Sequence, residues 1–236
     1  LTHAERRRKA WVSLGLLLTV HPRLKKTLHP GQVDPEGFLA GRAEALESAL
    51  SLRLQEARDI FSGNFPDMAD KEISAAGKAG VSIVTWEDDG YPPSLRYLPD
   101  PPPFLYVRGD LLPRDADAVA VVGSRRGTPY GLRVAERIAA ELAAARITVV
   151  SGLARGIDTA AHRGALAGGG RTIGVLGSGI DVVYPSENKR LFHEVAGAGA
   201  VVTELPFGAG PLPWHFPVRN RIIAGKEGRR HVLACI

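Results

Sequence analysis

The chain has 236 residues, of which 44% are hydrophobic, so it can form one large domain or two smaller ones around a buried core, and it is not a disordered tail. The formal net charge of +5 favours an anionic partner, although charge alone does not separate nucleic acid, nucleotide and an acidic membrane surface. The single cysteine, Cys235, excludes an internal disulfide and disfavours a cysteine-rich metal site, which indicates a reducing cytoplasm.

A basic run at residues 6–9, followed by an apolar stretch at residues 11–20, imitates the start of a secretory signal peptide. No small-residue cleavage site follows it, because the next residues are His-Pro-Arg-Leu-Lys-Lys. The apolar stretch is also far shorter than the roughly 20 residues that a membrane span requires. We therefore expect a cytoplasmic protein without a membrane partner.

Residues 1–72 are expected to form a small helical domain. Pro35 suits a first helical position and follows Asp34, so a helix start is predicted there. Apolar residues recur at helical spacing over residues 43–61, which predicts a further helix. The many charges indicate a solvated outer face, which is typical of a structural or protein-contact module.

The segment from about residue 86 to residue 115 is rich in proline and is flanked or interrupted by two apolar pieces, residues 81–84 and residues 104–107. Short apolar runs bounded by proline are typical of strands. We predict two strands joined by a rigid connector.

From residue 118 onward, apolar segments alternate regularly with amphipathic ones. Strands are predicted at 118–122, 147–151, 172–176 and 200–204, and helices at 130–145, 158–167 and 186–196. This alternation predicts an α/β fold with a mainly parallel, doubly wound sheet covered on both faces, which we assign to a domain over residues 73–236. Any ligand is expected along the edge where the parallel strands end.

Three strand-to-helix turns carry small residues at that edge. They are Gly123-Ser124-Arg125, Gly152-Leu153-Ala154-Arg155-Gly156 and Gly177-Ser178-Gly179. Glycines allow a close approach of the backbone to a ligand, and helix N-termini favour an anion, so the turns predict a phosphate-binding wall. Neither the dinucleotide motif G-x-G-x-x-G nor the P-loop motif G-x-x-x-x-G-K-[ST] occurs in the sequence, so we predict no nucleotide cofactor.

A short helix is predicted between Pro217, at its first position, and Gly225, just past its end. Its first half carries Arg219, Asn220 and Arg221, where free backbone donors and the helix dipole favour an anion. The alternative interpretation is a surface helix with two solvated arginines.

No spacing in the sequence forces a nucleophile, a base and an orienting acid together, so we do not predict an enzyme. Asp158 is expected to cap its helix, and His162, one turn later, is expected to be a packed structural histidine. Asp181 and Glu204 are isolated carboxylates, and no metal site is predicted.

Several ordered motifs together resemble those of the bacterial DNA-processing protein A family, also called Smf. They are Ala120 to Arg125, Ser151 to Asp158 with Ala161-His162, Gly177 to Asp181 with Tyr184-Pro185 and Asn188, Thr203 to Pro206, Phe216 to Gly225, and the segments Tyr91 to Leu95 and Pro103 to Gly109. The resemblance covers roughly residues 80 to 225. The helical N-terminus suits the sterile-alpha-motif-like domain often found in this family.

The resemblance implies an extended Rossmann-like domain that binds single-stranded DNA without sequence preference. It further implies that the protein hands this DNA to a RecA-type recombinase during natural transformation, and that it forms a homodimer. On the family pattern, Arg125 would meet DNA phosphates, the glycine turns would offer backbone donors, Lys189 would add positive charge, and Phe216 would stack on a base.

The chain departs from the family pattern after Gly225, where a Leu-Ser pair and an apolar strand usually follow. Here residues 226–231 read Lys-Glu-Gly-Arg-Arg-His before a short apolar piece, and no C-terminal winged-helix sequence is present. This departure weakens the expectation of a dimer most.

Two other functions remain open at this point. One is a nucleotide phosphoribohydrolase on a related fold, although residues 168–172 lack the proline and the final spacing of its Pro-Gly-Gly-x-Gly-Thr loop. The other is a plain protein-interaction scaffold.

Overall fold

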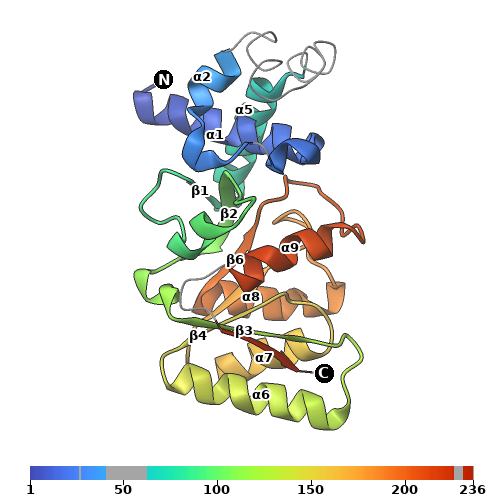
Figure 1. Cartoon of the computed structure of the whole chain (residues 1–236). Coiled ribbons are helices and arrows are strands. Elements are labelled where there is room, and N and C mark those ends of the chain that lie inside the picture. Colours follow the sequence, from blue (N-terminus) through green and yellow to red (C-terminus); the bar gives the residue numbers. More distant parts are fainter. Residues whose placement is uncertain (27, 41–62, 226–230, 236) are drawn as a thin grey trace.

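The computed structural model describes residues 1–26, 28–40, 63–225 and 231–235. Helices at the N-terminal end of the molecule stand on an α/β part built around one seven-stranded sheet of order β1-β2-β6-β5-β4-β3-β7 (Figure 1). The predicted fold class, a mainly parallel sheet in an extended Rossmann-like domain preceded by a helical region, is confirmed.

The helical region contains five described elements. They are α1 (His3–Val20), η1 (Pro22–Lys26), η2 (Pro30–Gln32), α2 (Pro35–Ala40) and α5 (Phe65–Ala79). Helix α1 begins with a capping box, in which the Thr2 side chain accepts the Glu5 N–H and the Glu5 carboxylate accepts the Thr2 N–H. Helix α2 starts at Pro35, as predicted. The helix predicted over residues 43–61 lies outside the described residues.

The predicted domain boundary between residues 72 and 73 falls inside helix α5. This helix continues to Ala79 and ends at Gly80, which adopts a left-handed conformation with φ of 63°. Helix α5 therefore runs across the predicted boundary.

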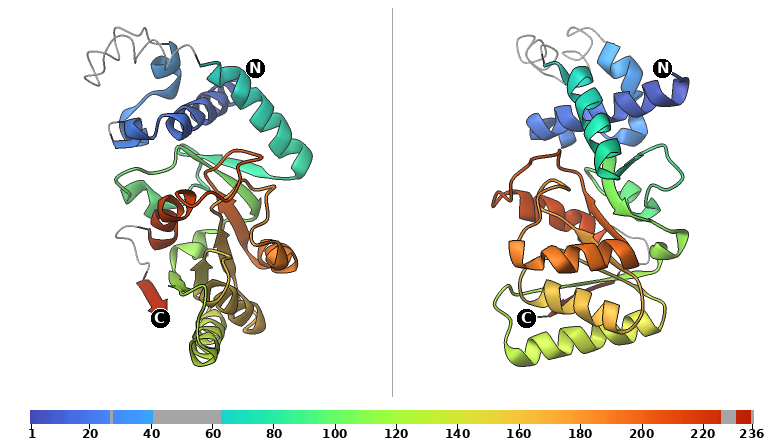
Figure 2. Two further views of the ribbon diagram at one scale, coloured as in Figure 1. Left: turned by 90° about the vertical axis from the view of Figure 1, so that its right-hand side faces the viewer. Right: turned by 180° about the vertical axis from the view of Figure 1, so that it is seen from behind.

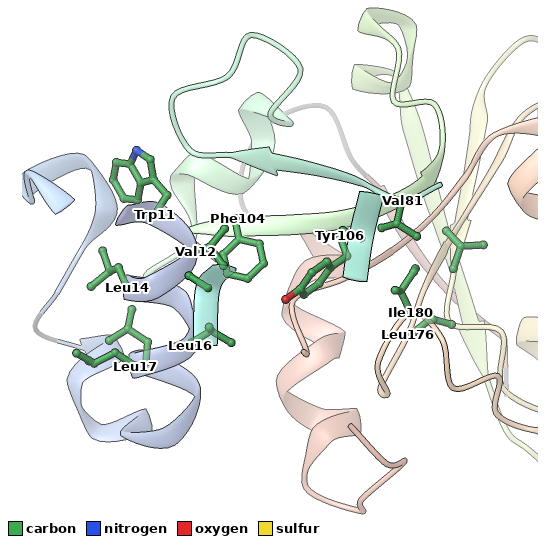
Figure 3. Packing of buried hydrophobic residues seen from close by; sticks show 14 of the residues in the cluster. Trp11, Val12, Leu14, Leu16, Leu17, Val81, Phe104, Tyr106, Leu176 and Ile180 are labelled. Carbon is green, nitrogen blue, oxygen red and sulfur yellow. The ribbon is translucent and has the colours of Figure 1, made fainter. Parts of the chain in front are cut away.

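The helical region shares a hydrophobic core with the sheet. Trp11, Leu14 and Leu17 of α1 belong to the same buried cluster as Phe104 and Tyr106 of β2 (Figure 3). A methyl group at Gly15 would overlap the Phe104 ring, so α1 reaches its close contact with the sheet through a glycine. Because the cluster is continuous, the two parts bury apolar surface together.

Five strands of the sheet run parallel to one another. In spatial order they are β6 (Ala200–Thr203), β5 (Thr172–Val175), β4 (Thr148–Ser151), β3 (Ala118–Gly123) and β7 (His231–Cys235). On the β6 side, β2 (Phe104–Gly109) pairs antiparallel with β6, and β1 (Ser82–Thr85) pairs antiparallel with β2. The predicted strands lie within two residues of the observed ones, and β7 shows that a strand does follow Gly225.

Helices cover both faces of the sheet, as Figure 2 shows in its left view. One face carries α6 (Pro129–Ala144), α7 (Ile157–Ala167) and, after η5 (Ser186–Asn188), α8 (Lys189–Ala198). The other face carries η3 (Pro93–Tyr97) and α9 (His215–Ala224), while η4 (Pro113–Ala116) leads into β3. Among the described helices, none combines the length and apolarity needed to cross a bilayer.

Candidate nucleic-acid interface

The three glycine turns meet at one edge of the sheet. Gly123 ends β3, Gly152 follows β4 and Gly177 follows β5, and these strands are parallel neighbours. The first two turns touch directly, because the Ile157 N–H donates to the Ser124 carbonyl at 3.2 Å. The carboxyl ends of the strands thus form the common edge that the sequence predicts.

Arg125 and Phe216 lie against each other at this edge. The Arg125 guanidinium sits over the Phe216 ring at 4.5 Å from its centroid, which is a close cation–π arrangement. Arg125 is exposed and Phe216 is half-buried. The structure therefore brings together a positive charge and an aromatic ring that are 91 positions apart in the chain.

Phe216 is held by residues of the third glycine turn. A Cβ added at Gly177 would meet the ring's Cδ1 atom at 2.9 Å, so only glycine lets the turn approach the ring this closely. The Tyr184 ring, from the loop after that turn, lies 5.9 Å from the Phe216 ring at an interplanar angle of 52°. The sequence motif contains Tyr184, but Tyr184 is not among the predicted site residues. The signal that could have identified it is an aromatic residue shortly after a glycine turn.

Arg219 does not face solvent. It is 5% exposed, and its Nη1 donates to the Gly152 carbonyl at 2.7 Å and to the Val175 carbonyl. Burial lowers the pKa of Arg219 to about 10, against the opposing influence of Asp158. Arg219 therefore joins the ends of β4 and β5 from inside and does not present its charge to an outside anion.

The burial of Arg219 follows from the face of α9 on which it lies. The helix begins at His215, so Pro217 is its third residue, whereas the sequence predicts it as the first. Arg219 then shares a helix face with Ile222 and Ile223, three and four positions later, and all three are buried. The prediction of an anion site on the first turn of this helix is wrong for Arg219.

Arg221 is also engaged within the protein. Its guanidinium pairs with Glu204 at 2.5 Å and with Asp100 at 3.1 Å, and the Lys25 ammonium lies 3.3 Å from the same Glu204 carboxylate. Burial opposes the ionisation of Glu204, but Arg221 and Lys25 outweigh it and hold the pKa of Glu204 below its usual value. Of the three polar residues predicted on this helix, only Asn220 is exposed.

Asp158 lies inside the first turn of α7, where Gly156, not Asp158, occupies the N-cap position. Burial raises the pKa of the Asp158 carboxyl, while Arg219 and hydrogen bonds from backbone N–H groups favour its charged form. These N–H groups belong to Ala154, Gly123 and Gly152.

His162 is fully buried and bonded through both ring nitrogens. The Leu153 N–H donates to Nε2 at 3.3 Å, and Nδ1 lies 2.7 Å from the Thr172 hydroxyl, which itself donates to the Val149 carbonyl at 2.9 Å. Nδ1 must therefore carry the proton in the neutral ring. Burial, assisted by Arg219, lowers the pKa of His162 to about 3, as expected of a structural histidine.

The serines of the turns have local roles. The Ser124 hydroxyl accepts the Arg126 N–H at 3.0 Å, which shapes the first turn. Ser178 is buried and donates to the Val182 carbonyl at 2.7 Å, and the Gly179 N–H donates to the Ala209 carbonyl at 2.8 Å. Polar groups of the third turn are therefore hydrogen-bonded within the protein, and the first turn is more open than the third.

Arg155, in the second turn, forms a two-pronged ion pair with Glu187 of η5. Nη2 donates to Oε2 at 3.0 Å and Nε donates to Oε1, and both side chains are exposed. Arg155 lowers the pKa of Glu187. Lys189, the first residue of α8, is exposed as well, and so is Arg126 of the first turn. Glu187 was not predicted as part of the site.

The described residues contain no group of three or more histidine, cysteine, aspartate or glutamate side chains arranged to hold a metal ion. The site therefore lies where the carboxyl ends of the parallel strands meet, and it carries exposed cations and aromatic rings.

Comparison with known proteins agrees with this architecture. Residues 82–228 match the family described as DNA recombination-mediator protein A, and the chain belongs to that family. Over 147 residues it is 44% identical to Protein Smf of Synechocystis, and over 138 residues it is 46% identical to the DNA processing protein DprA of Streptococcus pneumoniae. These alignments cover 61% and 58% of this chain but only 37% and 49% of the relatives, so the chain spans less than half of their length.

Two solved structures show the same fold. DNA processing protein A of Streptococcus pneumoniae matches with a TM-score of 0.60 at 34% identity, over 85% of this chain and 72% of that one. DNA processing protein A of Helicobacter pylori, described for its single-stranded DNA binding mode, matches with a TM-score of 0.56 at 32% identity, over 65% and 70% of the two chains.

Proposed function

We propose that this protein binds single-stranded DNA without sequence preference and loads a RecA-type recombinase onto it during natural transformation. The observation that carries the binding proposal is the Arg125 guanidinium over the Phe216 ring at an exposed edge of the sheet. Proteins that bind single strands combine a basic track for the backbone with aromatic rings for the bases.

The charges of the site support this proposal. Arg125 lies over the Phe216 ring, Arg155 and Lys189 are exposed as well, and the carboxylate of Glu187 pairs with Arg155. Arginine and lysine bind phosphate through charge, which reads no base identity. Ring faces stack on any base, so neither kind of contact selects a sequence.

The buried groups of the site support binding over catalysis. His162 is held neutral and engaged on both nitrogens, and Asp158 is buried against backbone donors. Neither is free to abstract a proton from a substrate. We propose that the protein is not an enzyme and needs no cofactor, and that the phosphoribohydrolase alternative fails.

In this proposal Gly123, Ser124, Arg125, Arg155, Lys189, Phe216 and Asn220 contact DNA directly. The remaining predicted contact residues support them from behind, by joining strand ends or allowing close packing. They are Gly152, Ala154, Gly156, Gly177, Ser178, Gly179, Arg219 and Arg221.

A titration against labelled oligonucleotides tests the binding proposal. Single strands should bind more tightly than duplex of the same length, and affinity should fall steeply with salt, because bound phosphates release counterions. Equal affinity for both forms, or no salt dependence, would contradict it. The release of free base from AMP in proportion to the protein added would instead support the enzyme alternative.

The partners are also part of the proposal. Recombinase loading predicts faster filament assembly on single strands coated with a single-strand-binding protein when this chain is added. A homodimer in the cytoplasm follows from the family resemblance, and light scattering tests the dimer. A strict monomer at micromolar concentration would contradict it, and recombinase loading should then be impaired even where DNA still binds.

A further inference from the structure

Tyr184 presents an open aromatic ring beside the site. Tyr184 belongs to the loop between β5 and η5 and is 40% exposed. Its ring centroid lies 5.9 Å from that of Phe216. A base that reaches Phe216 therefore comes within reach of Tyr184 as well.

The Phe216 ring is already partly occupied. The Arg125 guanidinium lies over it at 4.5 Å, Arg219 lies 5.9 Å from its centroid, and Gly177 presses against its Cδ1 edge. A base that stacks on Phe216 must compete with Arg125 for the ring. Among the described residues, no cation lies over the ring of Tyr184 in this way.

We propose that Tyr184 is a base-stacking residue of the site, so that one base lies on Tyr184 while Arg125, seated on Phe216, takes the neighbouring phosphate. The inference rests on the proposed single-strand binding and names a residue that carries part of it. Stacking on an aromatic face tolerates every base, so it preserves binding without sequence preference.

The chain offers a matched control in Tyr97. This tyrosine is 65% exposed, so it is at least as accessible as Tyr184. It ends η3, between β1 and β2, and follows none of the parallel strands that carry the glycine turns. If exposure of an aromatic ring were sufficient for DNA contact, both tyrosines would matter.

The test is fluorescence anisotropy with an end-labelled oligo(dT). Tyr184→Ala should bind at least about fivefold more weakly than the unaltered chain, or about 1 kcal/mol. The salt dependence should stay the same, since no charge is removed. Tyr184→Phe should retain the affinity, because it keeps the ring, and Tyr97→Ala should be unchanged.

A second oligonucleotide separates stacking from other contacts. On a strand of the same length made of abasic sites, Tyr184→Ala and the unaltered chain should bind equally, because no base is present to stack. Tyr184→Leu, which keeps apolar bulk without a ring, should bind like Tyr184→Ala. It serves as a control for a folding defect, and a thermal melt of each variant checks that it is folded.

Two results would overturn the inference alone. One is wild-type affinity of Tyr184→Ala for oligo(dT), and the other is an equal loss on the abasic strand. Failure of the unaltered chain to bind any single strand would instead overturn the proposed function, and the inference with it.

Discussion

Arg155 and Glu187 form a two-pronged ion pair across two turns of the site, with Nη2 and Oε2 3.0 Å apart. A phosphate that binds Arg155 must replace this carboxylate. We therefore expect Glu187→Gln to bind single-stranded DNA more tightly than the unaltered chain, because the competing charge is gone.

Glu194→Gln is the control for this change. Glu194 pairs with Arg190 on α8, and its substitution by glutamine removes the same formal charge. Equal gains in affinity for both variants would mean that net charge, and not the release of Arg155, is responsible.

Arg125→Ala should weaken binding and flatten its salt dependence. Loss of one phosphate contact should lower the slope of log affinity against log salt by about 0.7 to 1. Arg114→Ala removes an arginine that is also exposed, from η4, which precedes β3 and so lies at the opposite edge of the sheet. An unchanged slope for Arg125→Ala, or the same change for Arg114→Ala, would rule out a direct phosphate contact.

Phe216→Leu should separate the ring from its packing. Leucine still fills the space against Gly177, so the free energy of unfolding should change by less than about 1.5 kcal/mol. DNA affinity should fall by about 1–3 kcal/mol with nearly the same salt slope, because the ring for which a base competes with Arg125 is lost while the charge of Arg125 remains. A folded Phe216→Leu with full affinity would show that the ring serves the protein core only.

His162 should make stability depend on pH. The pKa of His162 is about 3 in the folded chain, well below that of an unfolded histidine near 6.5, so the unfolded chain binds more protons between these values. The free energy of unfolding should therefore fall as the pH decreases from about 6.5 toward 3, by up to about 1.4 kcal/mol per pH unit from this group.

Urea denaturation at several pH values measures this effect. His162→Gln should be less stable at neutral pH and should show a shallower decline over the same range. His193→Gln, at an exposed position on α8, should keep the slope of the unaltered chain. A slope that His162→Gln leaves unchanged would assign the acid sensitivity to other groups.

The strands, the helices of the parallel part and their common edge could be predicted because buried strands and amphipathic helices leave strong periodic patterns. The position of α9 could not. Pro217 is tolerated as the third helical residue because the first N–H groups of a helix have no partner within it, so its missing donor costs nothing there either. The burial of Arg219 follows from the side of α9 that packs on the sheet, which Arg219 shares with Ile222 and Ile223.

The pairing of charged groups was equally hidden from the sequence. Arg219 finds backbone carbonyls of two strands, and Arg155 finds Glu187, 32 positions away. Such partners are set by how the turns meet in space, which no local pattern records. Arg125 and Phe216 were expected to contact the same DNA because the family resemblance relates residues that are far apart in the sequence.

The Lys25–Glu204 pair bears on any exchange of the helical region between relatives. Glu204 belongs to the α/β part and is buried, and one of its cations, Lys25, arrives from η1 of the helical region. A chimaera that replaces residues 1–40 without a cation at this place would leave Arg221 to neutralise the carboxylate while it also serves Asp100. Because removal of one partner of a buried ion pair is costly, compatible grafts should be recognisable by a lysine or arginine that reaches this glutamate.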